Sequence, residues 1–412
     1  MKSFPYLILG GGVAAGYALR EFALQGGQKE ELGLITAENV LPYDRPSLSK
    51  GFLSGAETLA DFSIVDSKFV REHGIHVFHK FLATAVDFRR RVIHGTGGQR
   101  VGFGKLLIAT GARVKKLDVP GGNLRGLFYL RSLDDSRAIR RVIGKGRKVV
   151  VVGGGFIGME TSAVCAKKGC LTTLVIPGKQ LMEDLFPESL AQYFERYYRA
   201  KGVEIVPHEK VTGFAGRGRV NGVKLASGRI LAADMAILGT GVSPATSLFE
   251  KSPLIRKDGI VVNPQMETSI LNVWAAGDVA QFPDFISHRQ NRIEHWDNAA
   301  WQGRVAMCNM MGKPLPFHHV PYFFSDMFDL SYQFWGDLTG HDSIVYRGNP
   351  AAGRVSVWWL RKRILIAALV LNRPDEESHL AAKWIFHGTA LNPRKLGDPH
   401  CRLGDLHRDF GQ

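Results

Sequence analysis

Short β-forming runs alternate with helical stretches along most of the chain, which is the pattern of parallel sheets with crossover helices. Residues 6–9 predict a buried strand, which a glycine turn joins to a helix over 14–25 and a second strand over 32–36. The same unit recurs later, with strands over 149–152 and 171–176 around a glycine turn and a helix. The chain therefore carries two copies of one strand–turn–helix–strand unit.

Each copy has a glycine pattern between its first strand and its helix. In the first copy, Gly10 permits a tight turn, Gly12 lets the backbone approach a pyrophosphate, and Ala15 allows close packing of strand and helix. The helix would then point its free N–H groups and positive dipole end at the phosphates. Glu38 follows the second strand, where an acid that binds a ribose belongs. These residues predict a dinucleotide site.

The second copy has Gly153, Gly155 and Gly158 in the same places, so we expect a second dinucleotide. The acid expected after its second strand is missing, because residues 176–179 read Ile-Pro-Gly-Lys. A carboxylate there would bind the 2′-hydroxyl of NADH and repel a 2′-phosphate. Its absence, with Lys179 nearby, favours NADPH or the use of both nucleotides.

A third element of the pattern is the acid that ends residues 274–278, Trp-Ala-Ala-Gly-Asp. Gly277 gives a small turn after a strand, and Asp278 stands at its end. Such an aspartate can hold the ribityl chain of a flavin. The alternative is that it caps a following helix.

Two further strands, over 106–111 and 236–241, finish in a Thr-Gly turn and predict switches between domains. From about His319 onward aromatic residues become dense, and strands over 355–360 and 364–371 predict an antiparallel sheet. We therefore predict an α/β fold with two nested Rossmann-like dinucleotide-binding domains and a C-terminal α+β domain. The predicted boundaries are 1–113 with 245–318 for the first domain, 114–244 for the second, 319–392 for the third, and 393–412 for a tail without a periodic pattern, read as a surface arm.

These motifs, in this order, resemble the FAD-dependent ferredoxin reductases and monodehydroascorbate reductases over nearly the whole chain. The resemblance rests on residues 42–46, 48–50, 109–112, Arg131, 153–160, 274–278 and 293–296. It implies FAD on the first domain and NADH or NADPH on the second. The FAD contacts that it implies are Gly10, Gly12, Ala15, Glu38, Arg45, Lys50, Ala109, Thr110, Gly111, Arg131, Gly277, Asp278, His295 and Trp296. The NAD(P)H contacts that it implies are Gly153, Gly155, Gly158, Glu160, Lys179 and Gly241.

The same resemblance implies four catalytic residues. Lys50 would lie beside the reactive flavin nitrogen and pair with Glu160, while Glu294 and His295 would lie near the flavin and nicotinamide rings. A lysine there stabilises the negative charge of the reduced ring, and Glu160 fixes its position. Taken without the resemblance, the Lys–Glu pair would be a surface salt bridge of little worth, and His295 a structural residue.

The four cysteines separate branches of the larger superfamily. Disulfide reductases of similar architecture need a Cys-x4-Cys pair early in the FAD domain, and residues 37–55 hold none. Cys165 and Cys170 have that spacing but belong to the second glycine unit, and the cysteines form no metal-ligand cluster. We therefore expect electrons to pass from the reduced flavin directly to a one-electron acceptor.

The formal net charge of +15 indicates an acidic partner. A [2Fe-2S] ferredoxin is the acceptor that we favour, because ferredoxins are typically acidic. Monodehydroascorbate reductase is the alternative, although Ala300 stands where those enzymes carry an arginine that engages the ascorbyl radical. A third hypothesis is a flavoprotein similar to apoptosis-inducing factor that binds nucleic acid or protein, but no specific nucleic-acid motif is present.

The remaining expectations concern location and assembly. The first strand begins by about residue 6, which leaves no room for a targeting peptide. The apolar run over 364–371 is far shorter than the roughly 20 residues of a membrane helix. We expect a cytoplasmic protein without membrane attachment that is a monomer or a homodimer.

Overall fold

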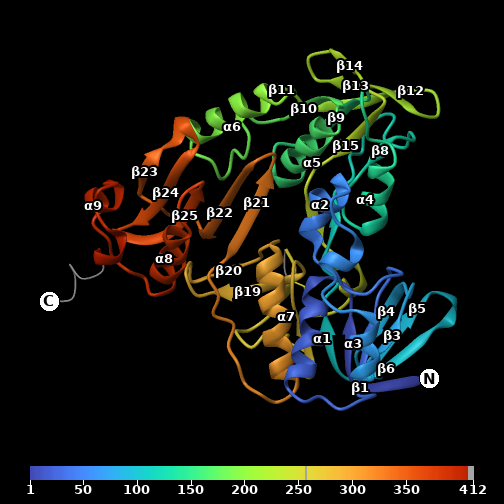
Figure 1. Ribbon diagram of the computed structural model, residues 1–412. Coiled ribbons are helices and arrows are strands. Elements are labelled where there is room, and N and C mark those ends of the chain that lie inside the picture. Colours follow the sequence, from blue (N-terminus) through green and yellow to red (C-terminus); the bar gives the residue numbers. More distant parts are fainter. Residues whose placement is uncertain (256–257, 407–412) are drawn as a thin grey trace. The chain divides into compact units, whose positions relative to one another are not determined.

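The chain divides into two compact units, seen in a computed structural model that describes residues 1–255 and 258–406 (Figure 1). Unit 1 comprises Met1–Arg45, Thr58–Arg113 and Val242–Pro321. Unit 2 comprises Pro46–Glu57, Val114–Gly241 and Tyr322–Gln412. Residues 407–412 of the predicted tail lie outside the described residues.

Unit 1 is built on a sheet with the strand order β3-β2-β1-β6-β5-β4, in which β18 also pairs with β6. Strands β3, β2, β1, β6 and β18 run parallel, whereas β4 and β5 pair antiparallel. The strands are β1 (Lys2–Leu9), β2 (Leu32–Ile35), β3 (His76–Phe78), β4 (Ala83–Asp87), β5 (Val92–Gly95), β6 (Arg100–Ile108) and β18 (Val273–Ala275). Smaller pairings involve β7 (Ala112–Val114) with β16 (Val242–Pro244), and β19 (Ala280–Asp284) with β17 (Ile260–Val261) and β20 (Arg289–Asn291).

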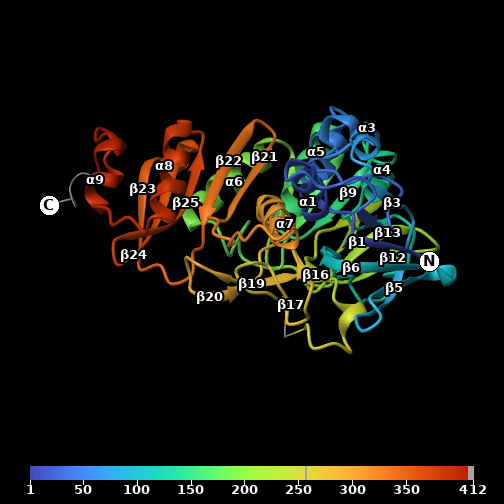
Figure 2. The same ribbon diagram turned by 90° about the horizontal axis from the view of Figure 1, so that it is seen from below.

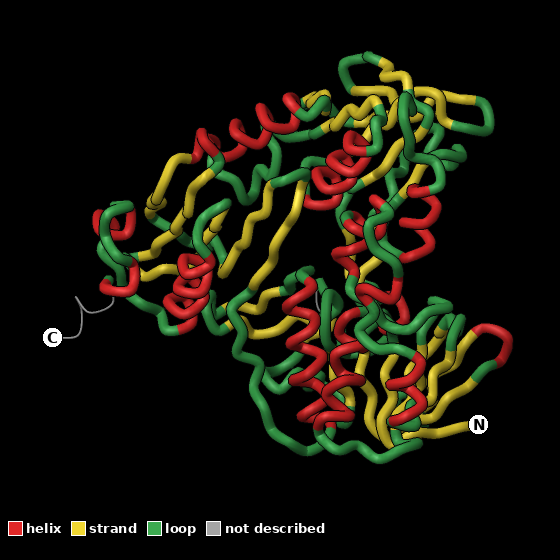
Figure 3. The backbone as a smooth tube through the Cα atoms, viewed as in Figure 1, coloured by secondary structure: helices red, strands yellow, loops and turns green. Residues whose placement is uncertain are grey.

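The helices of unit 1 are α1 (Val13–Leu24), α3 (Ser67–Glu72) and α7 (Trp296–Met310). Helices α1 and α7 lie side by side (Figures 1 and 3). They approach closely because Gly303 has no side chain: a Cβ atom there would lie 2.1 Å from the carbonyl oxygen of Ala14. The core beneath them includes the fully buried Leu7 and Ile8 of β1, as expected for a parallel strand covered on both faces.

The middle part of unit 2 contains a parallel sheet with the order β11-β10-β9-β15-β8. Its strands are β8 (Leu127–Phe128), β9 (Lys148–Val152), β10 (Leu171–Val175), β11 (Val203–Val206) and β15 (Met235–Leu238). Its helices are α2 (Gly51–Ser54), α4 (Leu133–Arg140), α5 (Phe156–Lys167) and α6 (Glu188–Ala200). A small antiparallel sheet adds β12 (Val211–Gly216), β13 (Val220–Leu225) and β14 (Ile230–Ala232).

The C-terminal part of unit 2 is an antiparallel sheet in the order β21-β22-β25-β24-β23. Helix α8 packs on β22 and β25 (Figure 2). The elements are β21 (Tyr322–Met327), β22 (Leu330–Gly336), β23 (Ser343–Asn349), β24 (Arg354–Arg361), β25 (Ile364–Leu371), α8 (Asp375–Phe386) and α9 (Pro393–Gly397). The predicted α/β fold, with a repeated parallel unit and a C-terminal α+β part, is confirmed.

The described part of the predicted tail, residues 393–406, differs from the predicted surface arm. It forms α9 and buries the side chains of Leu396, Leu403 and Leu406. The buried guanidinium of Arg347 donates hydrogen bonds to backbone carbonyls in this segment, including that of Cys401 at 2.9 Å. A buried arginine without acceptors would be costly, so the carbonyls and Arg347 hold each other in place.

Candidate functional site

The first glycine loop joins β1 to α1 in unit 1. Gly10 has φ of +120°, and a Cβ atom there would lie 2.1 Å from the carbonyl oxygen of Ala109, so the fold itself requires this glycine. Gly12 is different, because it caps α1 at φ −89° and ψ −163°, which any residue adopts. A Cβ atom at Gly12 would meet only the Arg45 guanidinium, 3.7 Å away, and no side chain caps the helix. The open backbone at the start of α1 suits a phosphate.

The second loop, between β9 and α5 in unit 2, has the same two kinds of glycine: some that the fold requires, and one that caps the helix and leaves room beside it. Cβ atoms at Gly153 and Gly158 would lie 2.3 Å and 1.7 Å from backbone oxygens. Gly155 caps α5 at φ −86° and ψ −168°, again without a side-chain cap, and a Cβ atom there would meet nothing within 4 Å. The two helix starts thus have the same geometry, and each leaves room for a phosphate.

The other predicted residues near the first loop lie at the ends of neighbouring strands. Glu38 follows β2 and accepts hydrogen bonds from Tyr43 at 2.7 Å and Arg45 at 3.0 Å. The Ala109 N–H donates to the Leu9 carbonyl at 2.8 Å, which places 109–111 beside the glycine loop. Further along this segment, Thr110 donates to the Ala245 carbonyl at 3.0 Å, and Gly111 has φ of +67°. Ala15 lies fully buried in α1.

Buried polar side chains of α7 lie near the turn after β18. The Gly277 N–H donates to Gln302 Oε1 at 2.8 Å. Among the described residues, Gln302 Nε2 and Asn298 Oδ1 are buried without a hydrogen-bond partner. Buried polar atoms normally have partners, so these atoms fit a polar cofactor such as FAD. The element after Asp278 is strand β19, so the alternative that this residue caps a helix is wrong.

Residues 294–296 lie at the start of α7, and the side chains of Glu294 and Trp296 have close partners. Glu294 pairs with Arg292 at 2.7 Å, and Arg292 also binds Asp258 at 3.1 Å. The Trp296 indole N–H donates to Asp44, a carboxyl whose pKa is raised by burial. Burial lowers the pKa of His295 to about 4, against the opposing effect of the Asp278 and Asp297 carboxylates. His295 is therefore a neutral imidazole at pH 7.

This state of His295 predicts how stability depends on pH. The unfolded histidine takes up a proton near pH 6.5, whereas the folded one resists protonation until about pH 4. The contribution of this group is thus complete above pH 6.5 and is lost as the pH falls from 6.5 toward 4. Denaturant titrations should show a larger loss across this window for the parent protein than for His295→Gln. Equal losses would show that His295 is not the group responsible.

Unit 2 contains the Lys50–Glu160 pair. Lys50 Nζ lies 2.9 Å from Glu160 Oε1, and their side chains are only 15% and 5% exposed. The ammonium also lies 5.1 Å from the centre of the Phe324 ring. This pair is buried, so the reading of it as a surface salt bridge is wrong.

The other predicted residues of unit 2 lie in turns. Arg131 precedes α4, and its N–H donates to Asp135 at 3.1 Å. Lys179 is exposed in the turn after β10. Gly241 has φ of +83°, and its carbonyl accepts from the Lys115 N–H at 3.0 Å.

Sequence reasoning missed one residue at the turn after β10. The carboxylate of Glu183 lies directly against Gly178, because a Cβ atom built on that glycine would be 1.9 Å from Glu183 Oε2. A carboxylate therefore lies at the turn after β10, contributed by a residue five positions beyond Gly178. The sequence pattern did not reveal Glu183, because that pattern places the acid directly at the end of the second strand.

The cysteines are all free thiols. Cys165 lies in α5 and Cys170 just after it, both buried in unit 2. The Cys170 thiol donates to the Gly144 carbonyl at 3.3 Å. Across residues 1–255 and 258–406, no group of His, Cys, Asp and Glu is arranged to hold a metal ion. The same residues form no helix both long and apolar enough to cross a membrane.

Comparison with known proteins defines the class. Residues 4–303 match the pyridine nucleotide-disulphide oxidoreductase family, and residues 322–407 match the reductase C-terminal family. The chain belongs to the pyridine nucleotide-disulphide oxidoreductase family, in the branch of the FAD-dependent ferredoxin and monodehydroascorbate reductases.

Similar proteins of both kinds are known. The chain is 37% identical to the peroxisomal monodehydroascorbate reductase 4 of Arabidopsis thaliana, over 99% of this chain and 86% of that one. It is 36% identical to the enzyme of Solanum lycopersicum, over 93% and 94%. Among solved structures it resembles putidaredoxin reductase in its covalent complex with putidaredoxin, with a TM-score of 0.93, 28% identity, and coverage of 98% and 97%. A ferredoxin reductase from Rhodopseudomonas palustris gives 0.92 and 29%, with coverage of 98% and 99%.

These findings confirm the enzyme class and its cofactors. The protein is an NAD(P)H-dependent flavin oxidoreductase that uses FAD. The geometry agrees with two bound dinucleotides, because two helix starts have room for phosphates. In the described part of unit 1, buried polar atoms of Gln302 and Asn298 also have no hydrogen-bond partner within the protein.

Proposed function

We propose that this reductase passes electrons from NAD(P)H, by way of FAD, to a [2Fe-2S] ferredoxin. The observation that carries the choice of acceptor is the net charge of +15. Basic clusters are exposed at 89–91 in unit 1 and at 140–141, 145–148 and 362–363 in unit 2. Such charge steers an acidic protein toward the enzyme and raises its rate of association. Likeness to putidaredoxin reductase supports the same class of partner.

We assign FAD to 1–113 with 245–318 and NAD(P)H to 114–244. When bound, FAD accepts a hydride from NAD(P)H and can release the two electrons one at a time. Gly12 and the start of α1 would bind its pyrophosphate, and Glu38 its ribose. Lys50 would hold positive charge where the reduced ring becomes negative, and Glu160 would orient that ammonium. His295, neutral at pH 7, would add no charge beside the rings.

A second candidate is the reduction of the monodehydroascorbate radical, favoured by the identity of 37% with an enzyme of that name. Ala300 weakens it. This residue is 3% exposed in α7 and offers no cation where those enzymes carry an arginine. Several of those relatives are peroxisomal by name, so the cytoplasmic location of this protein stays a prediction. Its monomeric or dimeric state is likewise a prediction.

The test compares acceptors on the same FAD-loaded enzyme. We expect kcat/KM to be higher with an acidic [2Fe-2S] ferredoxin than with ascorbyl radical, and to fall steeply between 50 and 200 mM salt, roughly as electrostatic steering does. Ferricyanide serves as a control for active enzyme. Faster, salt-insensitive turnover with ascorbyl radical would establish the second candidate instead. Slow oxidation with every acceptor would favour the third hypothesis, a flavoprotein similar to apoptosis-inducing factor that binds nucleic acid or protein.

Glu183 allows a prediction on the nucleotide. Because its carboxylate lies against Gly178, it can bind the 2′-hydroxyl of NADH and repel the phosphate of NADPH. We expect Glu183→Gln to reduce the ratio of kcat/KM for NADH over NADPH by about tenfold, the effect of one charged hydrogen bond. Asp184→Asn removes the same charge one residue away and should leave the ratio unchanged. Equal shifts of this ratio in both variants would mean that Glu183 acts only through general electrostatics. Lys179 would then be the residue that we expect to set the preference between NADH and NADPH.

A further inference from the structure

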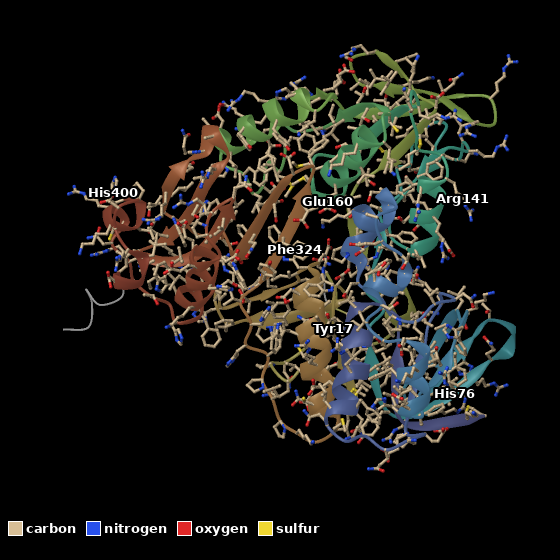
Figure 4. The ribbon with its side chains drawn as sticks, in the orientation of Figure 1. Tyr17, His76, Arg141, Glu160, Phe324 and His400 are labelled. Carbon is tan, nitrogen blue, oxygen red and sulfur yellow. The ribbon has the colours of Figure 1, made fainter. Side chains whose placement is uncertain are left out.

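The carboxylate of Glu160 is held by three donors. Lys50 Nζ lies 2.9 Å from Oε1, and the Ser325 hydroxyl donates to the same oxygen at 2.5 Å. The Ser49 hydroxyl donates to the other oxygen, Oε2. Glu160 is 4% exposed and Ser325 is fully buried, so water cannot replace these bonds. Figure 4 shows Glu160 on α5 and Phe324 on the strand β21.

These donors come from segments far apart in the sequence. Ser49 and Lys50 stand at the start of α2, whereas Ser325 lies 165 residues beyond Glu160 in β21, an outer strand of the C-terminal sheet. The preceding residue, Phe324, contacts the Lys50 ammonium with its ring at 5.1 Å. One strand of the C-terminal sheet therefore contacts both members of the pair.

Two buried phenols lie close enough to interact electrostatically with Glu160, Tyr198 of α6 and Tyr332 of β22. Burial raises the pKa of both hydroxyls well above the usual range, and the negative charge of Glu160 acts in the same direction. Both phenols therefore stay protonated and neutral. Neither phenol binds the carboxylate, because the Tyr198 hydroxyl donates to the Met159 carbonyl at 3.1 Å and, within the described residues, the Tyr332 hydroxyl has no hydrogen-bond partner. The orientation of the carboxylate therefore depends on Lys50 and on the two serine hydroxyls, since the hydroxyls fix an angle that a flexible ammonium alone does not.

We infer that Ser325 is a positioning residue for flavin reduction, which acts through Glu160 on Lys50 with help from Ser49. The inference rests on the proposed role of Lys50 beside the flavin. It makes the C-terminal sheet a part of the reductive machinery, because the hydroxyl that orients Glu160 comes from that sheet. A loss of this hydroxyl lets the carboxylate rotate and the ammonium move, while the nucleotide loops at Gly12 and Gly155 are untouched.

The test compares two serines of the same sheet. Ser325 and Ser356 are both fully buried, and each donates to a buried carboxylate at 2.5 Å, Ser356 to Glu377. Alanine at either position should therefore lower the melting temperature to a similar degree. Stopped-flow reduction by saturating NAD(P)H should slow about tenfold in Ser325→Ala only, within the range that a displacement of about 1 Å costs. FAD content and the Kd of the nucleotide should stay as in the parent.

Ser325→Thr, which keeps a hydroxyl, should recover most of the rate, and it gives a second folded variant if alanine lowers the yield. A parent-like rate in Ser325→Ala, or an equal slowing in Ser356→Ala, would overturn the inference. Lys50→Met separates it from the proposed function. If Lys50→Met slows reduction and Ser325→Ala does not, only the inference fails. If Lys50→Met reduces flavin at the parent rate, the role of Lys50 and the inference both fail.

Discussion

Gly12→Val is expected to give a folded protein that has lost its FAD. The backbone at Gly12 suits any residue, and a Cβ atom there meets only the end of the Arg45 side chain at 3.7 Å. The added methyl groups would occupy the place of the pyrophosphate instead. We expect FAD affinity to fall at least about a hundredfold, equivalent to about 2.8 kcal/mol. The flavin absorbance per protein after gel filtration measures the loss, and circular dichroism verifies the fold.

Gly155→Val is the matched control, because both glycines cap a helix with nearly the same dihedral angles. Valine costs each helix start about 1 kcal/mol, so the two variants should lose similar stability. Gly155→Val should keep its FAD and raise the KM for NAD(P)H. In contrast, Gly10→Ala should damage the fold itself, since its Cβ would overlap the Ala109 carbonyl. Full flavin content in Gly12→Val would refute the assignment of FAD to the first loop.

Glu160→Ala should both destabilise the protein and slow its reduction by NAD(P)H. The variant leaves the Lys50 ammonium, 15% exposed, without its carboxylate, and it leaves two serine hydroxyls without an acceptor. Removing one member of a buried pair costs about 3 kcal/mol or more. We expect flavin reduction to slow by about a hundredfold, because the ammonium is no longer held in place. Denaturant titration and stopped-flow absorbance measure the two effects.

The double variant Lys50→Met/Glu160→Leu separates stability from chemistry. Apolar residues of similar volume can replace a buried ion pair at little cost, so the part of the loss that comes from the unpaired ammonium should return, whereas the Ser49 and Ser325 hydroxyls still lack their acceptor. The rate should not return, because the variant lacks the positive charge that we propose beside the flavin. A double variant that recovers both would show that the pair serves only the fold.

Some of this could be predicted from the sequence because it is local. The strand–glycine–helix units depend on residues within about 30 positions of each other, and steric demands at Gly10 and Gly153 leave few alternatives to glycine. The structure confirms both units, with β1 and α1 in the first and β9, α5 and β10 in the second. Two dinucleotide sites followed from the same loops, whereas the class of enzyme and the identity of its two cofactors followed from the resemblance of the motifs to a known family.

Other features depend on contacts between distant residues, so no local pattern reveals them. Residues 393–406 show no periodicity, yet they are packed, because Arg347, some 50 residues earlier, needs carbonyls of this segment as acceptors. Glu183 reaches Gly178 only through the fold of an irregular loop. The sequence order alone would leave the strand end without an acid.

The sequence by itself determined that this chain binds two dinucleotides, because the glycines at the helix starts form a local pattern. The missing cysteine pair is equally visible in the sequence, and it predicts electron transfer without a dithiol relay. Only the tertiary structure decided what surrounds Lys50. Lys50, Glu160 and Ser325 are separated by more than 100 residues at each step, and burial turns their weak surface-type contacts into a fixed arrangement. Hydrogen bonds are stronger in a water-free interior and hold such an arrangement. Burial arises only when the chain folds, so the sequence alone does not show it.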